Sequence, residues 1–178
     1  MTRIVVIVGS LRAASINKKY AQQLEALVPE GVVFDYANLN MPLFNEELEA
    51  HFPTEAQALK DQLADADGVL FVTPEYNRSF PGVLKNAIDW ASRPWGTNSF
   101  DGKPVAIVGV SGSLATTQAQ QQLRNVLVYL NTKLLGQPEM YINKTTTFTE
   151  SGELTDDAKA FANSFLSVFL KHVAYNKS

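Results

Sequence analysis

Residues 68–90 read GVLFVTPEYNRSFPGVLKNAIDW, and they place a strand, a loop and a helix in immediate succession. The run 68–72 is apolar without alternation, which is typical of a strand buried on both faces of a parallel sheet. The loop that follows is polar and is bracketed by two prolines. Ligands of open α/β sheets bind just outside the carboxyl ends of such strands. The stretch therefore predicts an α/β fold with a binding loop, in which Glu75, Tyr76 and Asn77 suit a flat, hydrogen-bonding heterocycle.

A second loop of this kind follows the apolar run 3–8 near the start of the chain. Residues 9–17 read GSLRAASIN and lead into a segment whose apolar residues recur at every fourth position, which predicts a helix. Ser15 is suited to be the N-cap of that helix. The unpaired N–H groups and the positive dipole end of a helix N-terminus attract anions, and Arg12 can add a fork of donors. The loop is therefore predicted to bind a phosphate.

Missing fingerprints narrow the choice of phosphate ligand. The loop lacks the pattern G-x-G-x-x-G of dinucleotide sites, and the chain lacks the pattern G-x-x-x-x-G-K-S/T of nucleoside-triphosphate sites. A hydroxyl-lined loop suits a terminal monophosphate better than a pyrophosphate, which is approached by bare glycine backbone. These observations point to a mononucleotide.

The two loops also carry a family resemblance. The patterns GSLRxxSxN at 9–17 and PEYNxSxPGxLKNAIDW at 74–90 resemble the two signatures of the NAD(P)H-dependent FMN reductases. This flavodoxin-like family includes quinone, azo-dye and chromate reductases, and the likeness extends from Met1 to about Leu135. It implies an enzyme that passes hydride from NADPH or NADH to FMN and onward to such a small-molecule acceptor by a ping-pong mechanism. Because the cofactor carries out this chemistry, no side chain is expected to act as a catalytic residue.

The resemblance and the chemistry assign roles to named residues. The FMN phosphate would be held by the first loop, through Ser10, Arg12, Ser15, Ile16 and Asn17. The edge of the isoalloxazine ring would be held by the second loop, through Pro74, Glu75, Tyr76 and Asn77. A third polar loop would close the pyrimidine side, through Ser111, Gly112 and Ser113. Family members commonly have a glycine pair and an arginine after this third loop. Residues 114–119 read LATTQA instead, a departure that bears on the third-loop contact and on the preference for NADH or NADPH.

The rest of the chain alternates strands and helices. Further strands are expected at 32–37, 104–110 and 139–142, with helices between them. Alternation of this kind predicts βαβ units and a parallel sheet. Five strands suggest a flavodoxin-like three-layer sandwich with strand order 2-1-3-4-5, whose mononucleotide site lies between strands 1 and 3. The two signature loops follow those two strands, and residues 1–178 are expected to form a single FMN-binding domain.

Helix starts can be predicted at two further places. Thr54 and Gln57 resemble a capping box at the start of a helix. Thr155 precedes two acidic residues, which favour the first turn of a last helix. That helix is expected to pack through three phenylalanines four residues apart, Phe161, Phe165 and Phe169.

Composition limits the partners of the chain. It has 178 residues and a net charge of −3, so it carries no basic footprint for nucleic acid. The absence of cysteine excludes disulfides, thiolate metal sites and iron–sulfur clusters, and His51 and His172 have no partner at the spacing of a metal site. No apolar run approaches roughly 18 residues and no leader peptide precedes the first strand. We therefore expect a cytoplasmic protein without a membrane span.

The helix after the second loop has a pattern that is relevant to whether copies of the chain associate. Its apolar residues within 83–91 cover an arc of ~160°, which is wider than a single buried stripe. Such an arc fits either a helix buried deeply in a monomer or a helix that contributes to a contact between subunits. The resemblance implies a homodimer, often a dimer of dimers, so a homodimer or homotetramer is expected. Trp90 and Trp95 are interpreted as packing residues, and Lys85 with Asp89 as a weak surface ion pair.

Other function classes stay open at this point. A flavodoxin-like electron carrier usually presents a strongly acidic face, so the net charge of −3 and Arg12 in the phosphate loop argue against it. A flavin-binding sensor without turnover is supported only by the altered third loop. A dinucleotide dehydrogenase is a weaker alternative, since the glycine fingerprint is absent.

Overall fold

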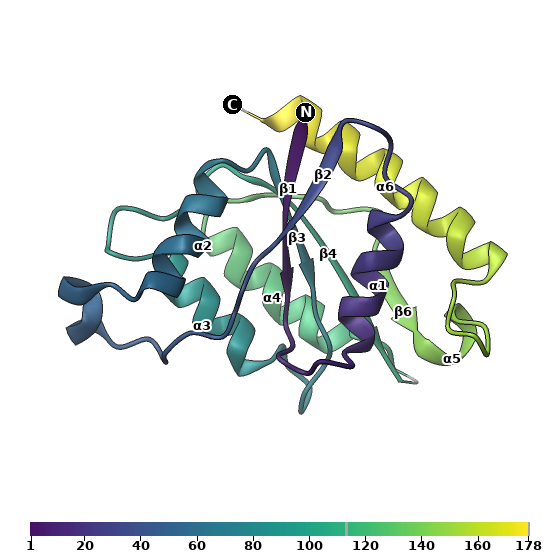
Figure 1. Cartoon of the computed structure of the whole chain (residues 1–178), viewed down its shortest axis with the longest axis horizontal. Coiled ribbons are helices and arrows are strands. Elements are labelled where there is room, and N and C mark those ends of the chain that lie inside the picture. Colours follow the sequence, from purple (N-terminus) through teal and green to yellow (C-terminus); the bar gives the residue numbers. More distant parts are fainter. Residues whose placement is uncertain (113, 178) are drawn as a thin grey trace.

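A parallel sheet forms the centre of the computed structural model, which describes residues 1–112 and 114–177. Its strands are β1 (Thr2–Val8), β2 (Val32–Tyr36), β3 (Gly68–Val72), β4 (Pro104–Ser111), β5 (Lys133–Leu134) and β6 (Met140–Asn143). The strand order is β2-β1-β3-β4-β5, and β6 also pairs with β4. Every pairing between these strands is parallel, which confirms the predicted flavodoxin-like order (Figure 1).

Two short strands share the fifth position of the sheet, where the sequence predicted one strand at 139–142. β5 pairs with the first two residues of β4, and β6 pairs with the last four. Gly136 and Pro138 lie between the two strands. Because proline has no N–H to donate to a neighbouring strand, hydrogen bonding to β4 is interrupted there.

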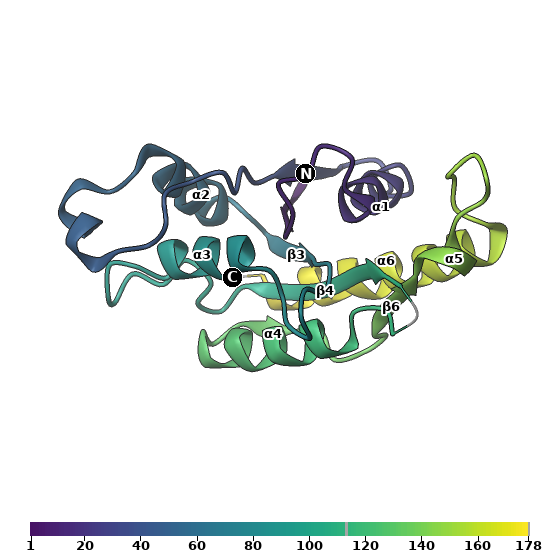
Figure 2. The same cartoon turned by 90° about the horizontal axis from the view of Figure 1, so that it is seen from below.

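Helices cover both faces of the sheet and give the predicted three layers (Figure 1, Figure 2). One face is covered by α1 (Ile16–Glu25) and α6 (Asp156–Asn176), and the other by α2 (Thr54–Ala64), α3 (Gly82–Ala91) and α4 (Thr117–Tyr129). The sequence did not predict two short elements, α5 (Lys144–Thr147) and the 3-10 helix η1 (Glu46–His51). Among the described helices, none is long and apolar enough to cross a membrane.

Strand β1 shows why its sequence does not alternate. Ile4 and Val6 belong to the hydrophobic cluster beneath α1 and α6, whereas Val5 and Ile7 belong to the cluster beneath α2, α3 and α4. All four side chains are fully buried. A strand that is covered on both faces needs apolar residues at every position, so the run 3–8 is a consequence of the layered fold.

Helices begin at both predicted places, but the predicted capping box is absent. α6 begins at the predicted place, and the hydroxyl of Thr155 caps it by accepting a hydrogen bond from the Ala158 N–H at 3.3 Å. The predicted capping box at Thr54 is wrong, because Pro53 takes the N-cap position of α2 and provides no side-chain cap. Thr54 is already the first helical residue. Its hydroxyl therefore lies one position too late to cap the helix.

Two of the three phenylalanines of α6 pack against the sheet. Phe165 and Phe169 are buried, and their ring centroids lie 5.9 Å apart, but Phe161 is 42 % exposed. Side chains four residues apart drift by ~40° around a helix. Phe161 therefore lies outside the buried arc centred on Ala162 and Phe169, and the prediction that all three residues share one face was wrong at this position.

Candidate functional site

The loops after β1 and β3 are in contact with each other. The Gly9 N–H donates to the Val72 carbonyl at 2.9 Å. A Cβ on Gly9 would lie 3.3 Å from Leu84 Cδ2 and 3.5 Å from Pro74 Cδ, so a side chain there would press on its neighbours. The strand order thus brings the two signature loops to the position between β1 and β3 where ligands bind in this architecture.

The first loop ends at a capped helix. Ser15 is the N-cap of α1, and its Oγ accepts from the backbone N–H three residues on at 3.3 Å. The Arg12 N–H donates to Ser10 Oγ at 3.3 Å, which folds the loop back on itself. The N–H groups of Ile16 and Asn17, in the first turn, have no acceptor within the helix. These groups and the exposed Arg12 side chain give the loop the character of an anion site.

The side chain of Asn17 is bonded to β4 and does not face the first loop's anion site. Its amide nitrogen donates to the Val110 carbonyl and its amide oxygen accepts from the Val110 N–H, each at 2.9 Å. The residue is 1 % exposed. Both polar groups therefore fasten α1 to β4, and only the backbone N–H of Asn17 is left to meet a phosphate.

A cavity of about 510 Å³ opens at this first loop. Arg12 and Lys18 line it together with residues 36–40, at and beyond the end of β2. Burial, and then the hydrogen bond and charge of Glu25, raise the pKa of the Tyr36 phenol, which therefore stays neutral. The sequence analysis missed residues 36–40. The predicted strand order could have indicated these residues, because the carboxyl end of β2 lies beside that of β1.

The second loop contains a tight hairpin. Tyr76 and Ser79 exchange two backbone hydrogen bonds of 2.8 and 3.0 Å. Asn77 and Arg78 form the turn, with φ angles of 51° and 66°. A two-residue turn with both residues at positive φ is of type I′. It leaves the Tyr76 side chain half exposed, so the ring can make the planar contact that the sequence predicts.

A second cavity, of about 290 Å³, lies between this hairpin and the loop after β4. It is lined by Glu75, Asn77, Arg78, Ser111, Gly112, Leu114 and Ala115. The structure thus brings predicted residues of the second and third loops together, and adds Arg78, Leu114 and Ala115, which were not among the predicted contacts. The predicted contact Ser113 lies outside the described residues.

Glu75 faces the start of α4 as well as this cavity. Its Oε2 accepts from the N–H groups of Gln118 and Ala119 at 2.9 and 3.1 Å. Its Oε1 lies 3.4 Å from the Arg78 guanidinium, and its side chain is only 7 % exposed. The carboxylate therefore caps α4, and the predicted contact of Glu75 with a heterocycle is left to its backbone.

The donors at the two loops match a phosphate-bearing heterocycle. Hydroxyls, a guanidinium and backbone N–H groups at the first loop are the groups that bind phosphate oxygens. The second cavity offers polar groups to a flat molecule, and the half-exposed Tyr76 belongs to the hairpin that forms one of its walls. Within residues 1–112 and 114–177, no cluster of three or more His, Cys, Asp or Glu side chains is placed to hold a metal ion.

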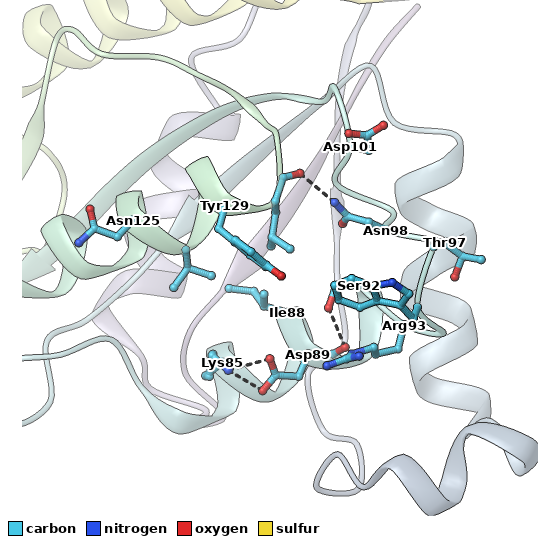
Figure 3. A pocket seen from close by; sticks show the side chains of 14 residues that line it. Lys85, Ile88, Asp89, Ser92, Arg93, Thr97, Asn98, Asp101, Asn125 and Tyr129 are labelled. Carbon is cyan, nitrogen blue, oxygen red and sulfur yellow. Dashed lines mark hydrogen bonds and ion pairs between the residues drawn. The ribbon is translucent and has the colours of Figure 1, made fainter.

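The largest cavity, of about 780 Å³, lies elsewhere, between α3, α4 and residues 92–101 (Figure 3). The predicted ion pair of Lys85 and Asp89 is present at its edge, at 2.7 Å. Figure 3 also shows Tyr129 of α4 projecting into the cavity. Both tryptophans were interpreted as packing residues: Trp90 is fully buried, as this interpretation requires, whereas Trp95 is 76 % exposed at this cavity and is not packed within the chain. The two signature loops themselves do not line this cavity, and the second signature contributes only residues of α3, namely Lys85, Ile88 and Asp89.

Comparison with known proteins agrees with this geometry. A model of the NADPH-dependent FMN reductase family matches residues 2–147. A 2-hydroxy-1,4-benzoquinone reductase from a Burkholderia species is 46 % identical over 171 residues, which cover 94 % of this chain and 93 % of that protein. A quinone reductase from Pseudomonas putida is 40 % identical over 179 residues, which cover 98 % and 96 %.

A solved structure is similar over the whole chain. FerB from Paracoccus denitrificans, a flavoenzyme NAD(P)H:(acceptor) oxidoreductase, is 37 % identical with a TM-score of 0.93, and 100 % of each chain is covered. All three relatives are named as enzymes. They therefore support the predicted oxidoreductase over the alternatives of an electron carrier or a flavin sensor.

Proposed function

The chain belongs to the NADPH-dependent FMN reductase family, and from this premise we propose that it is an FMN-dependent enzyme that carries electrons from NADPH or NADH to quinones, azo compounds or similar acceptors. The observation that carries the proposal is the contact between the two signature loops. It connects the anion site at the first loop to the hairpin that lines the cavity of about 290 Å³, which is called the ring cavity from here on. The names of the relatives favour a quinone as the acceptor.

The FMN phosphate would lie at the start of α1. Ser10, Ser15 and Arg12 would hold it through hydroxyls and the guanidinium, and Ile16 and Asn17 through backbone N–H groups. This assignment is supported by the cap geometry of α1 and by the cavity at the first loop. It keeps the predicted residues and assigns the contact of Asn17 to its backbone N–H, because its side chain is bonded to Val110.

The flavin ring would lie in the cavity between the hairpin and the loop after β4. Residues 74–77 would meet its edge through their backbone, Tyr76 would add a planar contact, and Ser111 and Gly112 would close the other side. When bound, FMN supplies the redox chemistry, and the chain supplies position and electrostatics. Backbone N–H groups aimed at the ring would stabilise the negative charge that it gains. Because donor and acceptor would use one open ring face in turn, ping-pong kinetics are expected.

Two copies of the chain would associate through the face around the largest cavity. Trp95 and Tyr129 expose aromatic side chains there, and Val128 is exposed beside Tyr129 in the sequence. Lys85 and Asp89 place opposite charges on the same face. A patch that carries both charges can meet a copy of itself in an isologous contact, which supports a homodimer or a dimer of dimers.

The proposal treats residues 1–178 as one FMN-binding domain, because a single sheet joins the two hydrophobic clusters. It also places the enzyme in the cytoplasm, where a diffusible nicotinamide donor is regenerated.

A visible absorption spectrum tests the proposed activity. Purified protein is mixed with FMN and then, without oxygen, with NADPH or with NADH. We expect the band of bound flavin to bleach with at least one donor and to recover when 1,4-benzoquinone is added. A bound flavin that neither donor bleaches would contradict the oxidoreductase. The absence of bound flavin would contradict the assignment of both loops.

A further inference from the structure

The hairpin after β3 has a residue that its own turn does not favour. Type I′ turns favour Asn followed by Gly, because both central residues have positive φ. Asn77 suits the first position, but Arg78 has a φ of 66° at the position where glycine is preferred. A side chain in this left-handed region is strained. Contacts from outside the turn must therefore help to hold the hairpin.

One such residue is Gln122, on α4. Its Nε2 donates to the Arg78 carbonyl at 2.9 Å, and its Oε1 accepts from the Ser79 hydroxyl at 2.6 Å. Both ends of one amide are thus used on two consecutive residues of the hairpin. The partners lie 43 and 44 residues away in the sequence, so this contact depends on the fold.

Glu75 ties the start of the hairpin to the same helix. Its carboxylate accepts from two N–H groups in the first turn of α4 and also lies beside the Arg78 guanidinium. The helix N-terminus is a place that attracts anions. Because Glu75 occupies it with a buried carboxylate, a phosphate group of a ligand is not expected to bind there.

These contacts act on the walls of the ring cavity. The hairpin forms one wall, and the loop after β4 forms the other and leads directly into α4. Glu75 and Gln122 therefore link one wall to the helix that begins at the other wall. The separation of the walls, and with it the position of Tyr76, depends on these two side chains.

We propose that the side chains of Glu75 and Gln122 have a positioning role: they set the affinity for FMN by holding the walls of the ring cavity, and only the backbone of Glu75 meets the cofactor. The inference rests on the proposed function, because it assumes that FMN occupies this cavity. Gln122 lies outside both signatures, and the carboxylate of Glu75 acts through α4.

The chain offers a matched pair of variants for the test. Gln122→Ala removes both contacts with the hairpin, whereas Gln121→Ala changes an exposed glutamine on the same helix. We expect Gln122→Ala to weaken FMN binding about fivefold in a fluorescence titration, as the loss of two neutral hydrogen bonds would allow. We also expect the backbone amides of Tyr76 and Ser79 to exchange hydrogen faster in the Gln122→Ala protein than in the unsubstituted chain, both measured without FMN. Gln121→Ala should change neither quantity.

Equal FMN affinity of the Gln122→Ala and Gln121→Ala proteins would overturn the inference. Failure of the unsubstituted chain to bind FMN would instead overturn the proposed function, and the hydrogen-exchange comparison would still decide whether Gln122 holds the hairpin.

Two further variants separate positioning from a general loss of stability. Arg78→Gly relieves the strained turn, so the Gln122→Ala substitution should cost less FMN affinity in that background; an equal loss in both backgrounds would contradict the mechanism. Glu75→Gln keeps an oxygen that can cap α4, so it should retain more FMN affinity than Glu75→Ala. Equal losses in these two proteins would contradict the role of the cap.

Discussion

Arg12 in the first loop and Asn17 in the first turn of α1 have different roles. The Asn17 side chain is buried and bonds to both backbone groups of Val110, so it fixes the start of α1 against β4. Arg12 is exposed and lines the cavity at the loop. One side chain holds the start of α1 in place, and the other is proposed to meet the FMN phosphate. Single substitutions can therefore separate stability from binding.

Asn17→Ala is expected to destabilise the protein. It would leave the buried N–H and C=O of Val110 without partners and lower the free energy of unfolding by about 2–4 kcal/mol. Urea denaturation of the FMN-free protein measures this change. Gln22→Ala, at an exposed position of the same helix, is the control and should cost less than ~0.5 kcal/mol. Equal stability of the two variants would show that the Asn17 bridge adds nothing.

Arg12→Ala is expected to affect binding instead. Loss of the guanidinium should weaken FMN binding more than tenfold, equivalent to ~1.4 kcal/mol, with little change in the free energy of unfolding. Lys171→Ala, which removes an exposed cation from α6, controls for the change in net charge. A fluorescence titration with unchanged affinity would rule out Arg12 as a phosphate contact.

Among the elements, the helices differ in how their first turns are satisfied. Ser15 and Thr155 cap α1 and α6 with their own hydroxyls, and the carboxylate of Glu75 caps α4 from another loop. α2 and α3 begin after Pro53 and Pro81 without a side-chain cap. A threonine near a helix start therefore matters only where it stands in the N-cap position.

Thr54 and Thr155 provide a direct comparison, because only Thr155 caps its helix. Thr155→Ala should lower the free energy of unfolding by about 1 kcal/mol, because the Ala158 N–H loses its partner. Thr54→Ala should change it by less than ~0.5 kcal/mol, since its hydroxyl caps nothing. Urea denaturation of both proteins checks this order, and a larger loss at Thr54 would contradict it.

For the whole molecule, the proposed contact between copies of the chain lies at the face around the largest cavity. It exposes Trp95 and Tyr129, and the Arg93 guanidinium lies 5.5 Å from the centroid of the Trp95 ring. Exposed aromatic residues and arginine are enriched at protein interfaces. The wide apolar arc of α3 faces inward, since Leu84, Ala87 and Ile88 are buried within the chain. The contact between copies would therefore depend on α4 and residues 92–101 more than on that arc.

Tyr129→Glu is expected to dissociate the proposed dimer. The added carboxylate would be buried at a contact between apolar surfaces, which is unfavourable without a partner charge. Light scattering after size-exclusion chromatography measures the mass. Tyr175→Glu makes the same change at an exposed position near the end of α6 and should leave the mass as it was. A dimer that survives Tyr129→Glu would place the contact elsewhere.

Much of the sheet could be predicted because its strands are recognisable from short stretches of the sequence. The runs 3–8 and 68–72 are apolar at every position, and this pattern has few explanations other than a strand covered on both faces. The strand order then followed from the alternation of strands and helices. Short elements such as β5 and η1 have too few residues to show a period, so the sequence could not reveal them.

The candidate site could be predicted only in part. Its loops are marked by their own residues, but the use of each side chain depends on partners far along the chain. The Asn17 amide meets a residue 93 positions away, and Glu75 meets α4 at 43 and 44 positions. No local pattern shows such partners. Residues suited to hold a ligand and residues that hold the loop are therefore indistinguishable until the fold is known.

The division of the fifth strand into β5 and β6 has a consequence for solubility. These strands form an outer edge of the sheet, where unpaired N–H and C=O groups can recruit a strand from another molecule. With Gly136 and Pro138 between them, the edge offers two short segments, of two and four residues, instead of one continuous template. Misdirected edge-to-edge association, the first step toward fibrous aggregates, is thereby discouraged on this side of the molecule.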